Sequence, residues 1–200
     1  MLPAVGFAQA DSLEYLSELE RGIVREHNRV RSDPAGYARF LRDLKPRFDG
    51  LLYQLTDSSV RETEEGIAAV DEAVHLLEAT VPLPPVGVSR GMSLGARDLV
   101  ADQGRTGRTG HLGSDGSQPW DRVDRYGDWE AAIAENVAYG YDTARDVVTQ
   151  LLVDDGVPER SHRANILNPE LRVVGVACGP HSGYGIVCVM TYAGGYKEQP

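Results

Sequence analysis

The sequence predicts an α+β fold in which helices fill the first two thirds of the chain and strands the last third. Apolar residues recur every three or four positions over most of residues 12–166, the spacing of amphipathic helices. Two β-rich runs follow, at 171–178 and 184–192, with a glycine-rich turn between them. A chain of 200 residues suits one domain with its own core better than two ordinary domains. We therefore expect a single domain over residues 11–200.

The first helix is expected over residues 12–31, because Asp11 can cap it and apolar residues follow at helical spacing. A second helix is expected to begin at Pro34, whose fixed backbone angle suits a first helical turn. A third is expected over residues 62–77. Residues 45–60 show no clear period, so they are interpreted as a packed loop.

A proline-rich segment, residues 81–88, cannot be helical and separates the third helix from a fourth that Ser89 can cap. The glycine-rich stretch that follows has no preceding strand and no terminal Lys-Ser/Thr pair, so it does not indicate a phosphate-binding loop. It is interpreted as a flexible approach to His111. Further helical segments are expected at 120–126, 143–153 and 158–166.

The charge balance excludes some classes of function. A formal net charge of -10 argues against nucleic-acid binding, which needs a basic face, and against anionic membrane surfaces. No run of about 18 apolar residues is present, so no transmembrane segment is expected.

The first ten residues, MLPAVGFAQA, end in a small-x-small pattern of the kind that precedes signal-peptidase sites. A basic start is missing, so residues 1–10 are interpreted as the remnant of a secretory signal. The alternative is a disordered N-terminus without a function.

The cysteine content agrees with export. Cys178 and Cys188 lie in the two β-rich runs on either side of the sequence GPHSGYG, which has the glycine content of a hairpin turn. Strands of equal length would place the two sulfur atoms opposite each other, and a disulfide is then expected in an oxidising compartment. The alternative is a pair of buried thiols.

Histidines and acids gather in the stretch between residues 111 and 162. His111, Glu135, Asp154, Asp155 and His162 are the side-chain types that bind a borderline cation such as Zn²⁺ at a water-accessible site. The alternative is a hydrogen-bonded network in which the acids fix the histidine tautomers and hold the walls of a cleft together. The residues alone leave both interpretations open.

Six motifs in order resemble those of the CAP superfamily, which includes the cysteine-rich secretory, antigen 5 and pathogenesis-related proteins. They are HNRVRSDP, GHLGSDG, AENVAYG, LLVDDGVPERSHRANILNP, VVGVACGPH and VCVMTYAGGY. The resemblance covers roughly residues 20–195 and is strongest to the SCP-like branch of bacteria and protists. It implies a three-layer α-β-α sandwich with a central antiparallel sheet, secreted to an extracellular or periplasmic location.

The resemblance also implies a cleft lined by two histidines and two acids. These correspond here to His111, Glu135, Asp155 and His162, which would bind a divalent metal, with zinc as the expected ion. The second acid is an aspartate where relatives have glutamate, so Asp154 is the competing assignment.

Two further positions concern the walls of this cleft. Asn136, next to the first acid, and Ser161, which stands where glycine is common before the second histidine, are expected to support it. Leu152 also departs from the family, in which tryptophan is frequent at this position.

The function expected from this resemblance is that of a secreted binding module for a divalent metal and a lipid, sterol or other small apolar ligand, rather than an enzyme. The first alternative is a hydrolase that uses a metal-bound water, or Ser161 activated by His162. Adjacent helical residues point about 100° apart, which is poor geometry for a nucleophile and its base. The second alternative is extracellular signalling or host interaction with a vestigial cleft. No protein partner is indicated.

Overall fold

The structure is a computed structural model that describes residues 13–56 and 59–199. The predicted signal remnant, residues 1–10, lies outside the described residues. The helices are α1 (Glu18–Ser32), α2 (Pro34–Leu44), the 3-10 turn η2 (Lys45–Arg47), α3 (Ile67–Ala79), α4 (Arg90–Thr106), α5 (Pro119–Val123), α6 (Ala144–Val153) and α7 (Ser161–Ile166). The strands are β1 (Phe48–Asp49), β2 (Leu52–Thr56), β3 (Ser59–Glu62), β4 (Gly87–Val88), β5 (Gly127–Tyr139), β6 (Val173–His181) and β7 (Gly185–Glu198).

The central sheet has four strands in the order β4-β6-β7-β5. β6 and β7 form an antiparallel hairpin, β5 is antiparallel to β7, and the short β4 is parallel to β6. Cys178 and Cys188 are direct partners across the hairpin and form a disulfide, which confirms the prediction. The loop between the two strands is therefore closed covalently as well as by the hydrogen bonds of the ladder.

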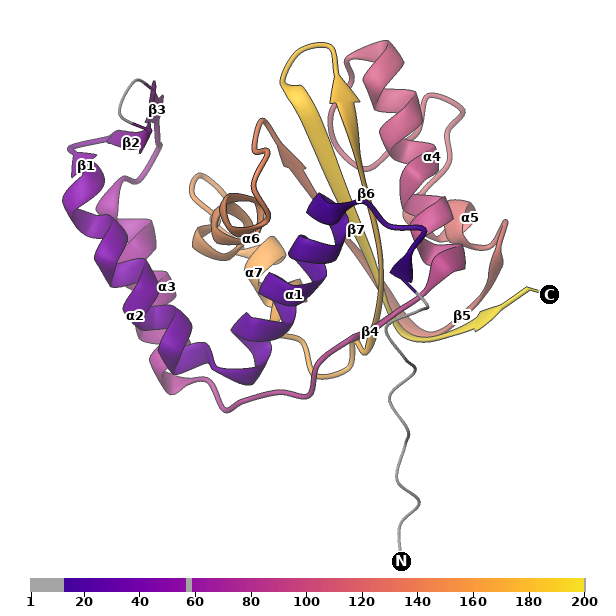
Figure 1. Ribbon diagram of the computed structural model, residues 1–200, viewed down its shortest axis with the longest axis horizontal. Helices are drawn as coiled ribbons and strands as arrows, with labels where there is room; N and C mark the ends of the chain where they lie inside the picture. Colours follow the sequence, from indigo (N-terminus) through magenta and orange to yellow (C-terminus); the bar gives the residue numbers. More distant parts are fainter. Residues whose placement is uncertain (1–12, 57–58, 200) are drawn as a thin grey trace, which may run out of the picture.

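Helices cover both faces of this sheet, which confirms the three-layer α-β-α sandwich (Figure 1). Alternate residues of β5 and β7 point to opposite faces. Val137 and Val189 pack under α4, whereas Ala138 and Met190 join the larger core that contains α1 and α6. α2 and α3 pack against each other and lie farther from the sheet (Figure 1).

The predicted loop over residues 45–60 is wrong in part, because β1, β2 and β3 form a small antiparallel sheet there. Along β2 the residues alternate between exposed and half-buried, with Tyr53 and Leu55 on the half-buried side. The strands are only two to five residues long. Such short runs of alternation are too brief to be distinguished from an irregular loop.

Other boundaries also differ from the prediction. The first helix begins at Glu18 because Ser17 caps it, accepting from the Glu20 amide while the Glu20 carboxylate accepts from the Ser17 amide. The third helix begins at Ile67, after β3. Within the described residues, no helix has both the length and the apolar character needed to cross a membrane.

Candidate functional site

The four histidines and acids expected to converge form two separate pairs instead. His111 Nδ1 lies 3.1 Å from a carboxylate oxygen of Glu135. His162 Nδ1 lies 2.6 Å from a carboxylate oxygen of Asp154. Each ring therefore has its own acid, and the two pairs are built by different elements.

Glu135 extends from β5 toward the α4 and α5 side of the sheet, where hydrogen-bond donors occupy both of its carboxylate oxygens. Arg122 of α5 donates to both carboxylate oxygens at 3.0 and 2.9 Å, and the hydroxyl of Thr191 donates at 3.0 Å. Both contacts come from the same guanidinium nitrogen, Nη2, and Arg122 and Glu135 are only 1% and 6% exposed, so this is a buried ion pair. The His111 ring closes the outer side of the pair and is itself exposed.

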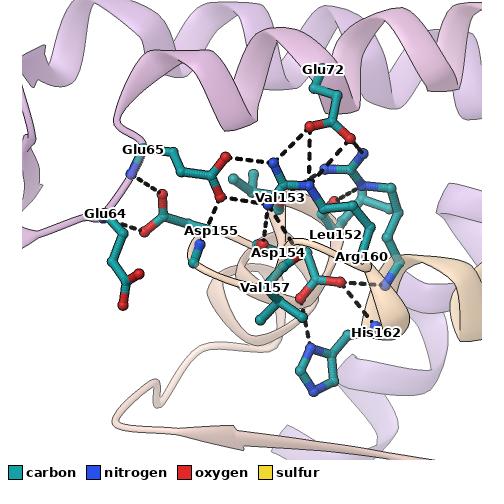
Figure 2. Close-up of polar contacts among 12 residues, drawn as sticks. Glu64, Glu65, Glu72, Leu152, Val153, Asp154, Asp155, Val157, Arg160 and His162 are labelled. Carbon is teal, nitrogen blue, oxygen red and sulfur yellow. Dashed lines mark hydrogen bonds and ion pairs between the residues drawn. The ribbon is translucent and has the colours of Figure 1, made fainter.

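Asp154 ends α6 in a left-handed conformation, with φ of 58°, and this turn directs its carboxylate toward the start of α7. One oxygen accepts the backbone amides of His162 and Arg163 at 2.9 and 3.1 Å. The other oxygen accepts from the His162 ring (Figure 2). In the neutral imidazole, the hydrogen is therefore on Nδ1 and Nε2 is an acceptor. Nε2 has no hydrogen-bond partner among the residues that the structure describes.

Asp155, the predicted second acid, does not contact His162. Its two oxygens accept the backbone amides of Glu64 and Glu65, each at 2.8 Å, and so fix the segment before α3 (Figure 2). The acid at His162 is Asp154, which was the competing assignment. The difference arises because the left-handed residue turns the chain, so the two neighbouring carboxylates point to different segments.

A charged cluster joins the α3 segment to α7: Arg160 pairs with Glu65 and Glu72 (Figure 2), and Arg163 also pairs with Glu72. Arg160 donates to both oxygens of Glu65 at 2.6 Å, and its guanidinium lowers the pKa of that carboxyl to about 2. Arg163 is 2% exposed and donates to the carbonyl oxygens of Leu152 and Val153. The cluster therefore fixes α7 on the end of α6 and sets the position of His162. It spans some 90 residues of sequence, so no local pattern predicted it.

The residues expected to support the cleft lie on the α7 side. Asn136 donates to the carbonyl oxygen of His162 at 3.0 Å and accepts from Asn165 at 2.8 Å. Ser161 is the exposed first residue of α7. Since Glu135 and Asn136 are neighbours in one strand, their side chains point to opposite faces of the sheet. The two histidine pairs are therefore associated with opposite faces.

This arrangement does not fit a resident metal ion. Among the described residues, no three histidine, cysteine, aspartate or glutamate side chains are grouped so that they could bind one. The buried guanidinium of Arg122 already neutralises Glu135, and a second cation beside it would be repelled. Both oxygens of Asp154 are also occupied by N–H donors.

A cavity of about 250 Å³ opens beside His162, between α6 and the small β1–β3 sheet. Its lining combines nine apolar or aromatic residues with ten polar or charged ones, and apolar atoms supply the larger share of its surface. The apolar and aromatic residues are Leu44, Phe48, Tyr53, Leu55, Val70, Tyr141, Leu151, Val153 and Val157.

Three solved bacterial structures resemble this chain. An outer surface protein from Borrelia burgdorferi is 17% identical, with a TM-score of 0.47 over 58% of this chain and 80% of that one. An extracellular protein containing an SCP domain, from Bacillus anthracis, is 17% identical, with a TM-score of 0.42 over 64% and 37%. A cysteine-rich secretory protein from Staphylococcus aureus is 14% identical, with a TM-score of 0.42 over 78% and 48%. The chain thus spans less than half the length of the last two.

Sequence comparison defines the family. No curated protein matches the chain. The family model of CAP, the cysteine-rich secretory protein family, matches residues 24–192, which include both histidine pairs and most of the α-β-α sandwich. The chain therefore belongs to the CAP family.

Proposed function

We propose that this CAP domain is an extracellular binding module for a small, largely apolar ligand, held in the cavity beside His162. The observation that carries the proposal is the cavity itself, in which apolar and aromatic side chains supply most of the surface and polar side chains supply the rest, as in small-molecule sites. At about 30 Å³ for each small group, its 250 Å³ accommodates about eight non-hydrogen atoms. A short alkyl chain or a single ring matches this size, whereas a whole sterol is larger.

The walls come from elements that are held together independently of a ligand. Phe48 and Tyr53 of the small sheet pack ring to ring, with centroids 4.7 Å apart. Arg47 lies over the Tyr53 ring, and Asp155 ties the segment after β3 to the end of α6. A preformed cavity of this kind avoids the entropic cost of ordering its walls when the ligand binds.

The alternatives from the sequence are less well supported. Metal binding is not part of the proposal. The carboxylate of Glu135 is already paired with a buried guanidinium, and the carboxylate of Asp154 already accepts hydrogen bonds from N–H groups. A hydrolase would need a nucleophile within hydrogen-bond reach of a histidine. In the described part of the chain, no serine, threonine or cysteine side chain is hydrogen-bonded to the ring of His111 or His162, and both cysteines are in the disulfide. An extracellular location rests on family membership.

Filling the cavity is expected to abolish binding of 1-octanol, a neutral ligand of suitable size. For nine non-hydrogen atoms we expect a binding free energy of about -5 kcal/mol, a Kd on the order of 0.2 mM. Val157 lines the cavity and is half-buried, so Val157→Phe should weaken binding at least about tenfold by occupying the same space.

The measurement is a titration followed by NMR shifts of the valine and leucine methyl groups. Leu76→Phe is the matched control, because Leu76 is 44% exposed on α3 and does not line the cavity; it should bind octanol like the unmodified protein. Unsaturable shifts in the unmodified protein, or normal binding by Val157→Phe, would contradict the proposal.

A further inference from the structure

One polar group at the cavity is a hydrogen-bond acceptor without a donor in the described part of the chain. Gln150 lines the cavity, and its side-chain oxygen is buried without a hydrogen-bond partner among the described residues. A buried acceptor left unpaired costs about 1–3 kcal/mol, so a donor from a ligand would remove this penalty. In its neutral form the His162 ring offers a second acceptor in Nε2, because its Nδ1–H is then committed to Asp154.

The negative charges around the cavity outnumber the positive ones. Its lining includes the carboxylates of Glu62, Glu64, Asp146, Asp154 and Asp155, against the single guanidinium of Arg61. Carboxylates of one sign around a low-dielectric hollow raise the local concentration of cations.

Glu62 and Glu64 are exposed, and Asp146 is the half-buried carboxylate of the lining that no backbone amide of another described segment engages. Asp154 and Asp155 are engaged by backbone amides, whereas Asp146 accepts only from Thr143 among the described residues. It lies four residues before Gln150 in α6, so the two side chains are neighbours on one face of the helix. Burial raises the pKa values of Tyr53 and Tyr141, and the charge of Asp146 adds to both increases. The field of Asp146 therefore reaches the aromatic walls.

The guanidinium of Arg61 is already engaged. It lies over the Tyr141 ring, 4.1 Å from the centroid, and donates to the Gly140 carbonyl oxygen at 3.2 Å. It therefore ties β3 to the segment before α6 and forms part of the wall. An anionic ligand would have to share this cation while facing the carboxylates around it.

We propose that the cavity selects a small alkylammonium ligand, with the ammonium group between Asp146 and Gln150 and the alkyl chain against Phe48, Tyr53 and Leu151. An ammonium group supplies donors to both the carboxylate and the unpartnered amide oxygen. This inference rests on the proposed function of the cavity as a ligand site. It specifies in addition the chemical class of the ligand's head group, an amine.

Three ligands of equal chain length distinguish the contribution of the head group to affinity from that of the alkyl chain. They are octylamine, 1-octanol and octanoate, which at neutral pH are cationic, neutral and anionic. Titrations of the full chain by NMR should give octylamine a Kd about tenfold below that of octanol, with octanoate the weakest. Asp146→Asn should remove most of the preference for the amine, so that octylamine and octanol bind with similar Kd values. Asp142→Asn, an exposed acid outside the cavity, should behave like the unmodified protein.

The outcomes distinguish this proposal from the binding role itself. If octanol binds and octylamine binds no more tightly, selectivity for an amine is wrong while the cavity remains a ligand site. If octanoate binds most tightly, Arg61 is the anchor and the proposal is overturned. If none of the three binds, both proposals fail. Thermal unfolding of each variant confirms that a lost preference does not reflect a lost fold.

Discussion

Replacing Arg122 with methionine is expected to lower the free energy of unfolding by about 3–5 kcal/mol, the usual cost of leaving a buried charge unpaired. Arg122 is 1% exposed and contacts both oxygens of the buried Glu135 carboxylate. It also donates to the carbonyl oxygens of His111 and Ser117 at 3.0 and 2.8 Å, so the loop that carries His111 loses its attachment as well. Urea denaturation at neutral pH, followed by circular dichroism, measures the change.

Two further variants identify the cause. Arg125→Met removes a neighbouring arginine whose pairs with Asp98 and Asp115 are at the surface, and it should cost less than about 1 kcal/mol. Adding Glu135→Gln to Arg122→Met should recover part of the loss, because the unpaired charge is then removed. A loss below about 1 kcal/mol in Arg122→Met alone would show that the ion pair does not hold this side of the sheet.

Acidification is expected to destabilise the protein through His27. Burial, together with the smaller effect of the nearby Arg31, lowers the pKa of this ring to about 3. Its two nitrogens have no hydrogen-bond partner among the described residues, and the ring packs on Tyr192 with centroids 5.4 Å apart. The unfolded chain binds a proton near pH 6.5, whereas the folded chain does not until about pH 3. Stability is therefore highest above pH 6.5 and falls as the pH drops toward 3.

His27 alone should account for about 3 kcal/mol of the stability lost between pH 7 and pH 4. Urea denaturation at pH 7, 6, 5 and 4 measures the profile. His27→Leu, an apolar substitution of similar volume, should flatten it by that amount relative to the unmodified protein. His75→Leu, at an exposed position of α3, should leave the profile unchanged. Parallel profiles for His27→Leu and the unmodified protein would contradict the assignment.

The parts of the fold that were predicted correctly have local causes. Thr143 caps α6, and Val147, Val148 and Leu151 supply the buried stripe, so ten residues contain the whole signal. The sequence of β5 carries a weak strand signal because its alternation is interrupted by a bulge between Glu130 and Ile133. Its residues are also largely small, and alanine has no preference for strands.

The candidate site shows a similar division. The residue types in the site could be predicted, since histidines and acids are concentrated between residues 111 and 162. Their pairing could not, because it depends on backbone geometry and on partners distant in sequence. The left-handed turn at Asp154 determines which acid meets His162. Arg122 converts Glu135 from a candidate ligand into half of a buried ion pair, and nothing in the short helix α5 identifies that arginine in advance.

The account depends most on the claim that the two histidines belong to separate pairs and that only His162 borders the ligand cavity. The most direct test is NMR of the histidine ring nitrogens during a titration with 1-octanol. We predict that His162 is protonated on Nδ1, that its Nε2 resonance shifts as the ligand saturates, and that both His111 nitrogens stay unchanged. A joint response of His111 and His162 would contradict the account and restore a single convergent cleft.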